Sequence, residues 1–143
     1  MTKQKLTTFL WFKGQAAEEA ARFYAATLPD ARVVSTSPVA TTFEVAGTRL
    51  VALNGNPGYA FTEATSILIE CEDQQEVDGL WAGLTAGGGE PGQCGWLKDR
   101  FGVSWQIIPR RLTELMGNPA VVQAMMKMTK IDIAALERAN RAG

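Results

Sequence analysis

Histidine is absent from this chain of 143 residues. The imidazole side chain is the commonest general base near neutral pH and the commonest ligand of transition metals. Its absence removes the usual centre of both kinds of site, so either role would fall to other residue types.

An excess of positive charge is also missing, since 14 Lys and Arg stand against 15 Asp and Glu and the formal net charge is −1. Domains that bind nucleic acid normally carry a basic excess or stripe, so we expect no nucleic-acid partner. No apolar run approaches the roughly 20 residues of a membrane-spanning helix, so we expect no membrane span. The segment Met1–Lys5 is polar where a secretory signal would be apolar, which favours a cytoplasmic protein.

Cysteine is scarce, with Cys71 and Cys94 the only two in the chain. They could form a disulfide, although two cysteines in such a chain are more often reduced thiols. The composition, with 46% hydrophobic and 20% charged residues, is that of an ordinary globular protein. At this length we expect one domain, residues 1–143, with a buried core.

Two segments of the chain, residues 5–57 and 63–109, show the same order of elements. Runs of β-formers predict strands, and apolar residues at helical spacing predict one helix in each segment. In the first segment we expect a strand over Leu6–Phe12, a helix over Ala16–Leu28, and strands over Ala31–Ser37, Ala40–Val45 and Thr48–Leu53. In the second we expect a strand over Thr65–Cys71, a helix over Glu72–Leu84, a strand starting within Glu90–Gly95, and a hairpin from Trp96 to Ile108. The chain therefore reads as two tandem βαβββ modules.

Residues 110–143 form a helical extension outside the repeat. Asn118 followed by Pro119 predicts one helix start, and Asp132 predicts another. Between them lies an apolar stripe, made of Val121, Val122, Met125 and Met126. Packing in a core or a dimer is the simpler interpretation of this stripe, and a methionine-lined binding groove is the alternative.

The stretch Gly92–Pro109 contains the second hairpin. A turn centred on Arg100 and Phe101 would pair Lys98 with Val103, Trp96 with Trp105, and Gly95 with Gln106. Since cross-strand neighbours share a face, this register places Cys94, Trp96, Trp105 and Ile107 against the helix, and Gly95, Leu97, Ser104 and Gln106 on the opposite face. Cys94 is then a buried structural cysteine rather than a nucleophile, because an activated thiol needs an exposed electropositive setting.

Three elements of the sequence carry a resemblance to a known family: Phe12–Tyr24, Cys71–Asp78 and, most specifically, Gly92–Pro109. They look like the PhnB-like proteins, which bear the label 3-demethylubiquinone-9 3-methyltransferase-like. These proteins belong to the vicinal oxygen chelate superfamily of glyoxalase I, extradiol dioxygenases and bleomycin resistance proteins. The resemblance extends into the tail at Lys130–Glu137. It implies an α+β fold, with two βαβββ modules forming curved mixed sheets around a cavity, plus C-terminal helices, and it implies a homodimer.

The resemblance also implies where metal ligands lie, because metal-dependent members of the superfamily carry them on the first and last strands of each module. The corresponding positions here are Thr7, Val51, Ser66 and Gln106. Two hydroxyls, an aliphatic side chain and an amide are poor replacements for histidine and carboxylate donors, so we expect no metal. The glycine run Gly87–Gly89 follows a helix instead of a strand, so no cofactor loop for a methyltransferase is recognisable and we expect no cofactor.

Strand alternation then selects the side chains that would line the cavity. The apolar candidates for ligand binding are Phe9, Trp11, Val51, Leu53 and Leu68, and the polar ones are Thr7, Ser66, Glu70, Ser104 and Gln106. An apolar pocket with a few polar groups suits a small molecule, so the predicted function is metal-independent binding of an unidentified small ligand. The alternative is an enzyme acting on a small carbonyl or aromatic substrate, with Glu70 as general base or Gln106 as oxyanion donor. For such an enzyme the sequence supplies neither a nucleophile nor a third, orienting residue.

Overall fold

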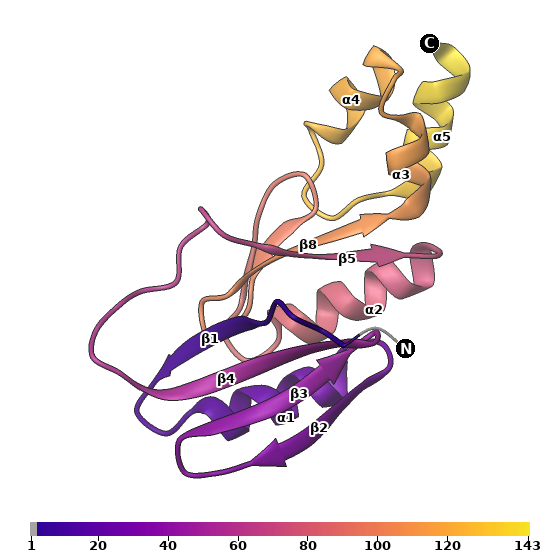
Figure 1. Ribbon diagram of the computed structural model, residues 1–143. Helices are drawn as coiled ribbons and strands as arrows, with labels where there is room; N and C mark the ends of the chain where they lie inside the picture. Colours follow the sequence, from indigo (N-terminus) through magenta and orange to yellow (C-terminus); the bar gives the residue numbers. More distant parts are fainter. Residues whose placement is uncertain (1–2) are drawn as a thin grey trace. The chain divides into compact units, whose positions relative to one another are not determined.

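The computed structural model describes residues 3–143, and its elements follow the predicted order (Figure 1). The chain divides into two units, the first ending at Ala60 and the second spanning Phe61–Gly143. This division falls between the two predicted modules, 5–57 and 63–109. Each unit contains one four-stranded mixed sheet and the helix of its own βαβββ module.

The first unit contains β1 (Thr8–Lys13), α1 (Ala17–Thr27), β2 (Ala31–Thr36), β3 (Ala40–Val45) and β4 (Thr48–Asn56). We call its sheet, with strand order β1-β4-β3-β2, sheet A; β1 and β4 run parallel and the other neighbours antiparallel. Alternate residues such as Leu10 and Phe12 are buried on the side of α1, where the rings of Tyr24 and Phe43 stack at 5.5 Å. The opposite face carries the more exposed residues of the same strands, as the period of two requires.

The second unit repeats this order with β5 (Ile67–Cys71), α2 (Gln74–Thr85), β6 (Glu90–Pro91), β7 (Trp96–Lys98) and β8 (Ser104–Pro109). Its sheet, sheet B, has the equivalent strand order β5-β8-β7-β6, with β5 parallel to β8. Val77, Leu80 and Leu84 of α2 are buried and supply its apolar face. Asp73 caps α2 by accepting a hydrogen bond from the amide of Glu76 at 2.9 Å. The predicted strand near Glu90 is shorter than expected and comprises only two residues.

The C-terminal extension comprises α3 (Arg110–Leu115), α4 (Pro119–Met125) and α5 (Ile133–Ala142). The predicted starts of α4 and α5 are confirmed, because the side chains of Asn118 and Asp132 accept hydrogen bonds from backbone amides of these helices. The helices share a buried apolar core made of Ile108, Leu112, Leu115, Val121, Ile131 and Leu136. Met125 and Met128 pack against this core, which agrees with the packing interpretation of the stripe, whereas Met126 is 64% exposed.

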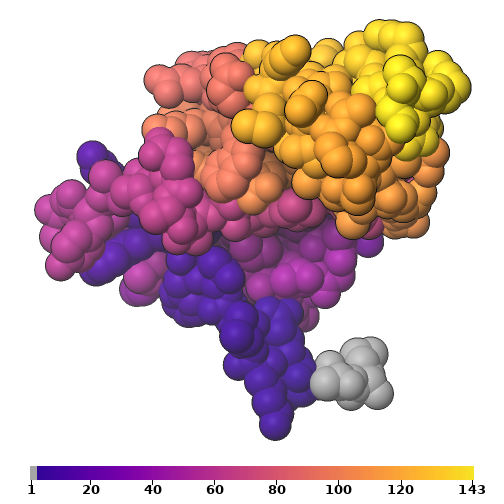
Figure 2. Space-filling view, turned by 90° about the horizontal axis from the view of Figure 1, so that it is seen from above, coloured from indigo at the N-terminus to yellow at the C-terminus, as the bar shows by residue number. Residues whose placement is uncertain are grey.

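Backbone hydrogen bonds fasten the extension to the loop before β7. The amide of Cys94 donates to Met128 O at 2.9 Å, and the amide of Gly95 donates to Thr129 O at 2.8 Å. Gly95 has a φ of +85° and packs tightly, since a Cβ there would lie 2.8 Å from Cδ1 of Ile108. Figure 2 shows the orange and yellow extension against the salmon-coloured residues of the same unit. The extension therefore covers the Ile108 end of sheet B.

The register of the second hairpin differs from the predicted one by one residue. Trp96 pairs with Gln106, Leu97 with Trp105, and Lys98 with Ser104. The connecting loop is Asp99–Val103, one residue longer than a turn centred between Arg100 and Phe101 allows. The prediction for Trp96 and Leu97 was therefore wrong: Leu97 is 2% exposed on the face of Trp105, and Trp96 shares the other face with Gln106. A one-residue slip in a strand exchanges its two faces.

The longer loop is held by the buried carboxylate of Asp99. One oxygen accepts hydrogen bonds from the amides of Phe101 at 2.9 Å and Val103 at 3.1 Å, and the other accepts from Nε1 of Trp105 at 2.9 Å. Asp99 is only 3% exposed. These three hydrogen bonds fix the loop length and hence the register of β7 on β8. Within residues 3–143, no helix is long and apolar enough to cross a membrane.

Candidate functional site

The open face of sheet A, the face opposite α1, carries four of the predicted apolar candidates. Phe9 lies beside Val51 and Trp11 lies beside Leu53 in the parallel pairing of β1 with β4. Phe9 is 57% exposed, while Trp11 is half-buried and lies near Tyr59, with ring centroids 5.7 Å apart. Thr7 precedes β1 and is exposed. These residues of β1 and β4 form an apolar, aromatic patch, while Thr42, Glu44 and Arg49 on the same face are polar.

The open face of sheet B, the face opposite α2, carries the polar candidates. Leu68, Gln106 and Trp96 form one row across β5, β8 and β7. Nε2 of Gln106 donates a hydrogen bond to Oγ of Ser66 at 2.9 Å, so two of the predicted polar residues contact each other. Leu68 is 50% exposed, and Ser104 lies on the same face one step along β8.

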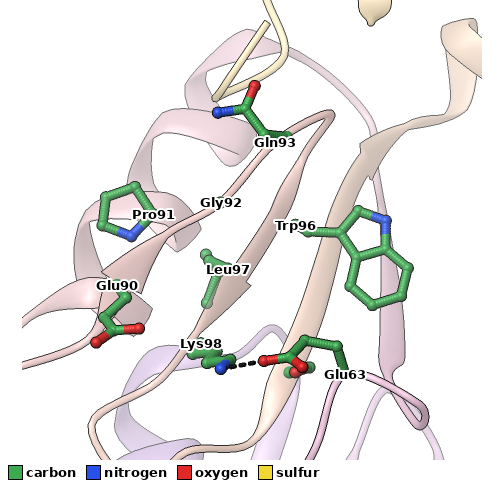
Figure 3. Close-up of a pocket in the computed structure, with 9 residues that line it drawn as sticks. Glu63, Glu90, Pro91, Gly92, Gln93, Trp96, Leu97 and Lys98 are labelled. Carbon is green, nitrogen blue, oxygen red and sulfur yellow. Dashed lines mark ion pairs between the residues drawn. The ribbon is translucent and has the colours of Figure 1, made fainter.

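A pocket of about 510 Å³ opens on this side of the second unit. Its floor and walls come from β6, the loop after it, β7 and the first residue of β8. The residues that line it are Glu63, Glu90, Pro91, Gly92, Gln93, Trp96, Leu97, Lys98 and Ser104 (Figure 3). Its volume is within the range of small-molecule sites, and its lining combines apolar side chains with a few polar groups.

Ser104 is the polar group of the pocket that has the least access to solvent, with 2% of its surface exposed. Its hydroxyl Oγ has no hydrogen-bond partner within residues 3–143. A buried hydroxyl without a partner lowers stability, because its hydrogen bonds to water are lost on burial and no protein hydrogen bond replaces them. A ligand atom in the pocket could supply the missing hydrogen bond after a rotation of the Ser104 side chain turned the hydroxyl towards the pocket.

Lys98 and Glu63 face each other at one end of the pocket and form an ion pair (Figure 3). Their hydrogen bond is the main cause that lowers the pKa of the Glu63 carboxyl and raises the pKa of the Lys98 ammonium. Both side chains remain accessible, with 36% of Lys98 and 61% of Glu63 exposed. An exposed pair contributes little to stability and can be rearranged at small cost.

Glu70 lies on the open side of sheet B but not in the pocket. Its side chain is 43% exposed, and its carboxylate accepts a hydrogen bond from Nε of Arg110 at 3.0 Å. A carboxylate that acts as general base near neutral pH is usually buried so that its pKa rises. The exposed, ion-paired setting of Glu70 offers no such burial.

The two cysteines are both free thiols. Cys71 is fully buried at the end of β5, and burial, reinforced by the negative charges of Glu76, Asp73, Glu70 and Glu72, raises the pKa of its thiol to about 12. Such a thiol is unreactive at neutral pH. Cys94 is half-buried in the loop that holds the C-terminal extension, and it does not line the pocket.

At the four positions that the family resemblance marks for metal ligands, the side chains are the hydroxyls of Thr7 and Ser66, the amide of Gln106 and the aliphatic side chain of Val51. Gln106 already donates to Ser66. Within residues 3–143, no group of three or more His, Cys, Asp or Glu side chains could hold a metal ion. This donor set does not fit Zn²⁺ or Fe²⁺.

The glycine run Gly87–Gly89 ends α2 and allows close packing of the backbone. The amide of Gly89 donates to Thr85 O at 3.0 Å and ends the helix. A Cβ at Gly89 would lie 2.7 Å from Cα of Thr85 and 2.8 Å from the carbonyl oxygen of Lys98, so only glycine fits between the two. The run does not connect a strand to the start of a helix, as a nucleotide-binding loop does. A methyl-donor site is therefore not recognisable in it.

The sequence prediction missed several pocket residues. Glu63 lies in an irregular segment without periodicity, and Glu90, Pro91 and Gln93 lie around a two-residue strand. Trp96 was assigned to the wrong face because of the register slip. The one signal that could have corrected it is Asp99, since an aspartate at the start of a turn often binds backbone amides beyond it.

Comparisons with known proteins agree with this architecture. The sequence profile of the family described as 3-demethylubiquinone-9 3-methyltransferase matches residues 4–108. The PhnB protein from Bacillus cereus is 31% identical, covers 74% of this chain and 99% of its own, and superposes with a TM-score of 0.67. No curated protein matches the sequence.

Two more distant solved structures share the fold. Protein PA1353 from Pseudomonas aeruginosa is 19% identical over 75% of this chain and 98% of its own, with a TM-score of 0.58. A glyoxalase-related enzyme from Fulvimarina pelagi is 17% identical over 76% of this chain and 91% of its own, with a TM-score of 0.57.

The family match spans both modules and ends at residue 108, immediately before α3. The C-terminal extension, including the segment Lys130–Glu137, lies outside it. Because the profile covers both βαβββ modules and the PhnB structure has the same fold, the chain belongs to the 3-demethylubiquinone-9 3-methyltransferase family of PhnB-like proteins, which has the glyoxalase-like fold.

Proposed function

We propose that this protein binds a small organic molecule, without a transition metal, in the pocket on the open side of sheet B. The observation that carries the proposal is the buried Ser104 hydroxyl, which lines a pocket of about 510 Å³ and has no partner within residues 3–143. Trp96 and Pro91 provide apolar surface around it, and Glu63, Glu90, Gln93 and Lys98 supply further polar groups. A pocket of this size that combines apolar surface with polar groups suits a small ligand.

The chemistry of the donor set supports the metal-independent part of the proposal. Hydroxyls and one amide occupy the positions at which metal-dependent relatives carry ligands, and such groups bind divalent transition metals weakly. The ligand would therefore be held by hydrogen bonds and apolar contacts alone. The alternative enzyme with Glu70 as general base gains no support, because Glu70 is exposed and ion-paired with Arg110.

A thermal-shift screen of the intact protein against small aromatic and heteroaromatic compounds tests the proposal. We expect stabilisers whose effect is unchanged by 1 mM EDTA, at about 1–3 kcal/mol for compounds present well above their Kd. The variant Ser104→Ala should lose part of the stabilisation, whereas Thr42→Ala, on the open face of sheet A, should not. A broad screen without any stabiliser, or hits that need added metal, would contradict the proposal.

A homodimer and a cytoplasmic location complete the proposal. Apolar side chains such as Phe9 and Leu68 are exposed on the open faces, and dimerisation would bury them against a second copy of the chain. Size-exclusion chromatography with light scattering distinguishes a dimer from a monomer directly. The two free thiols favour a reducing compartment, which labelling of the protein in cell fractions would test.

A further inference from the structure

Three residues at one end of the pocket determine its charge. Glu90 and Lys98 are cross-strand partners on β6 and β7, and Lys98 is ion-paired with Glu63 (Figure 3). All three line the pocket. Two carboxylates therefore stand around the one ammonium among the lining residues, and the pocket carries a net charge of −1, from one positive and two negative groups.

The remaining lining is suited to the body of a ligand. Trp96 presents a large aromatic surface, and Pro91 is apolar and exposed. The indole of tryptophan is the most favourable aromatic partner of an organic cation. Ser104, which is 2% exposed, adds a hydroxyl that has no partner among the described residues, 3–143, and can either donate or accept.

From this arrangement, and resting on the proposed function, we infer that the pocket selects small organic cations: a protonated amine attached to a flat apolar body. The ammonium group lies next to Glu90 and Glu63, the body lies on Trp96, and a polar atom of the ligand reaches Ser104. An anion would have to displace Glu63 from Lys98 and would still meet the carboxylate of Glu90.

The order of affinities follows from the repulsion between an anionic ligand and the carboxylates of the pocket. Ion pairs between exposed groups are worth little individually, so a single charge changes affinity by a small factor. Reversing the ligand's charge turns each attraction into a repulsion and so changes affinity by more than removing the charge does. The expected order of affinity is therefore amine, neutral compound, acid.

Three probes with the same aromatic body and different charge test this order: phenethylamine, phenylethanol and phenylacetate. Their dissociation constants can be measured by titration, following the indole resonance of Trp96 by NMR at low salt. We expect phenethylamine to bind about two- to fivefold more tightly than phenylethanol and about tenfold more tightly than phenylacetate. Raising the salt concentration to 300 mM should reduce both ratios.

The double variant Glu63→Gln/Glu90→Gln provides the sharpest test, because both side chains are at the surface and the substitutions keep their size. The variant leaves Lys98 as the charge of the pocket, so phenylacetate should become the tightest of the three probes. The matched control is Glu44→Gln, which removes a carboxylate from sheet A, where Glu44 on β3 pairs with Arg49 on β4. It should leave the wild-type order unchanged.

The inference is overturned if phenylethanol binds as tightly as phenethylamine to the wild type, or if the double variant keeps the wild-type order. Either result, obtained with a saturable shift of Trp96, leaves the proposed function in place. Absence of a saturable shift with all three probes also overturns the inference. If screening hits likewise leave Trp96 unchanged, the proposed function fails as well.

Discussion

The two βαβββ units have the same strand order but different open faces. On the open face of sheet A, Phe9, Trp11, Val51 and Leu53 form two neighbouring apolar cross-strand pairs, beside the Glu44–Arg49 ion pair. Sheet B presents a hydrogen-bonded Gln106–Ser66 pair, the Ser104 hydroxyl, which has no partner among residues 3–143, and the Lys98–Glu63 ion pair. Helix-facing residues are apolar in both units, because that face supports the fold. The open face is where the units have diverged.

The edges of the two sheets differ as well. β2 has six residues, whereas the equivalent β6 has two and continues into the irregular segment Gly92–Gly95. The pocket is lined by this shortened edge. The same segment binds the C-terminal extension through Cys94 and Gly95. A shortened edge strand thus gives the second unit both a pocket and an attachment point for additional helices.

The largest difference in stability should come from the two hairpins. The first uses the two-residue turn Ala46–Gly47, while the second depends on the buried carboxylate of Asp99. Asp99→Ala leaves two amides and one indole N–H without their acceptor, so we expect a loss of about 4 kcal/mol in the free energy of unfolding. Urea denaturation measures it.

The control for this prediction is Glu44→Ala in the first hairpin. Glu44 forms exposed ion pairs with Arg32 and Arg49, so its loss should leave the urea midpoint nearly unchanged. Equal effects of Asp99→Ala and Glu44→Ala would show that the second hairpin does not depend on its buried carboxylate.

Alanine substitutions at two glycines with almost the same backbone conformation distinguish the stability lost through backbone strain from the stability lost through overpacking. Gly47 has a φ of +83° with open space around it, and Gly95 has a φ of +85° with Ile108 and Ile131 close by. Gly47→Ala should cost about 1 kcal/mol, the price of a left-handed alanine. Gly95→Ala should cost about 3 kcal/mol, because overpacking adds to the same backbone strain.

Denaturant unfolding of both variants gives the two values. Their difference measures how tightly the C-terminal extension packs on the second unit. If the two substitutions lower the free energy of unfolding equally, the C-terminal extension moves to accommodate the added methyl group. In that case it does not pack tightly on Gly95.

The smallest expected effect is a difference in reactivity between the two thiols. Both lie in the second unit, so their labelling reports on that unit alone. Cys71 is buried with a thiol pKa of about 12, so in the native protein a thiol reagent at pH 8 should modify Cys94 first and Cys71 only after unfolding. Mass spectrometry of the labelled peptides distinguishes the two.

The raised pKa of Cys71 also predicts a dependence of stability on pH. An unfolded cysteine ionises near pH 9 and the folded one near pH 12, so the stabilising contribution is complete below pH 9 and is lost as the pH rises towards 12. The variant Cys71→Ala should lack this part of the alkaline decline. A decline of the same size in both proteins would contradict the assignment.

The sequence was sufficient for the elements whose signals are local. The helix starts at Asn118 and Asp132 each depend on residues within a few positions, and the structure agrees with them. The strand predicted over Ala40–Val45 from its run of β-formers is also confirmed with the same bounds.

The pairing register of the second hairpin could not be predicted from local signals of this kind. Its five-residue loop is determined by the hydrogen bond from Trp105 to Asp99, six positions apart, and a shift of one residue exchanged the faces of Trp96 and Leu97. The pocket depends on that shift and on Glu63, which reaches Lys98 from a segment without regular structure. Such contacts between distant residues leave no periodic signal in the sequence.

The most direct test of the account is fluorine NMR of the protein labelled with 5-fluorotryptophan. Of the four tryptophans, Trp11 reports on the open face of sheet A and Trp96 on that of sheet B, while Trp81 in α2 and the buried Trp105 serve as references. Titration with phenylethanol and with each stabilising compound should move the Trp96 signal most, with saturation, and the shift should weaken in Ser104→Ala. Stabilising compounds that move Trp11 and leave Trp96 unchanged would contradict a binding site on sheet B.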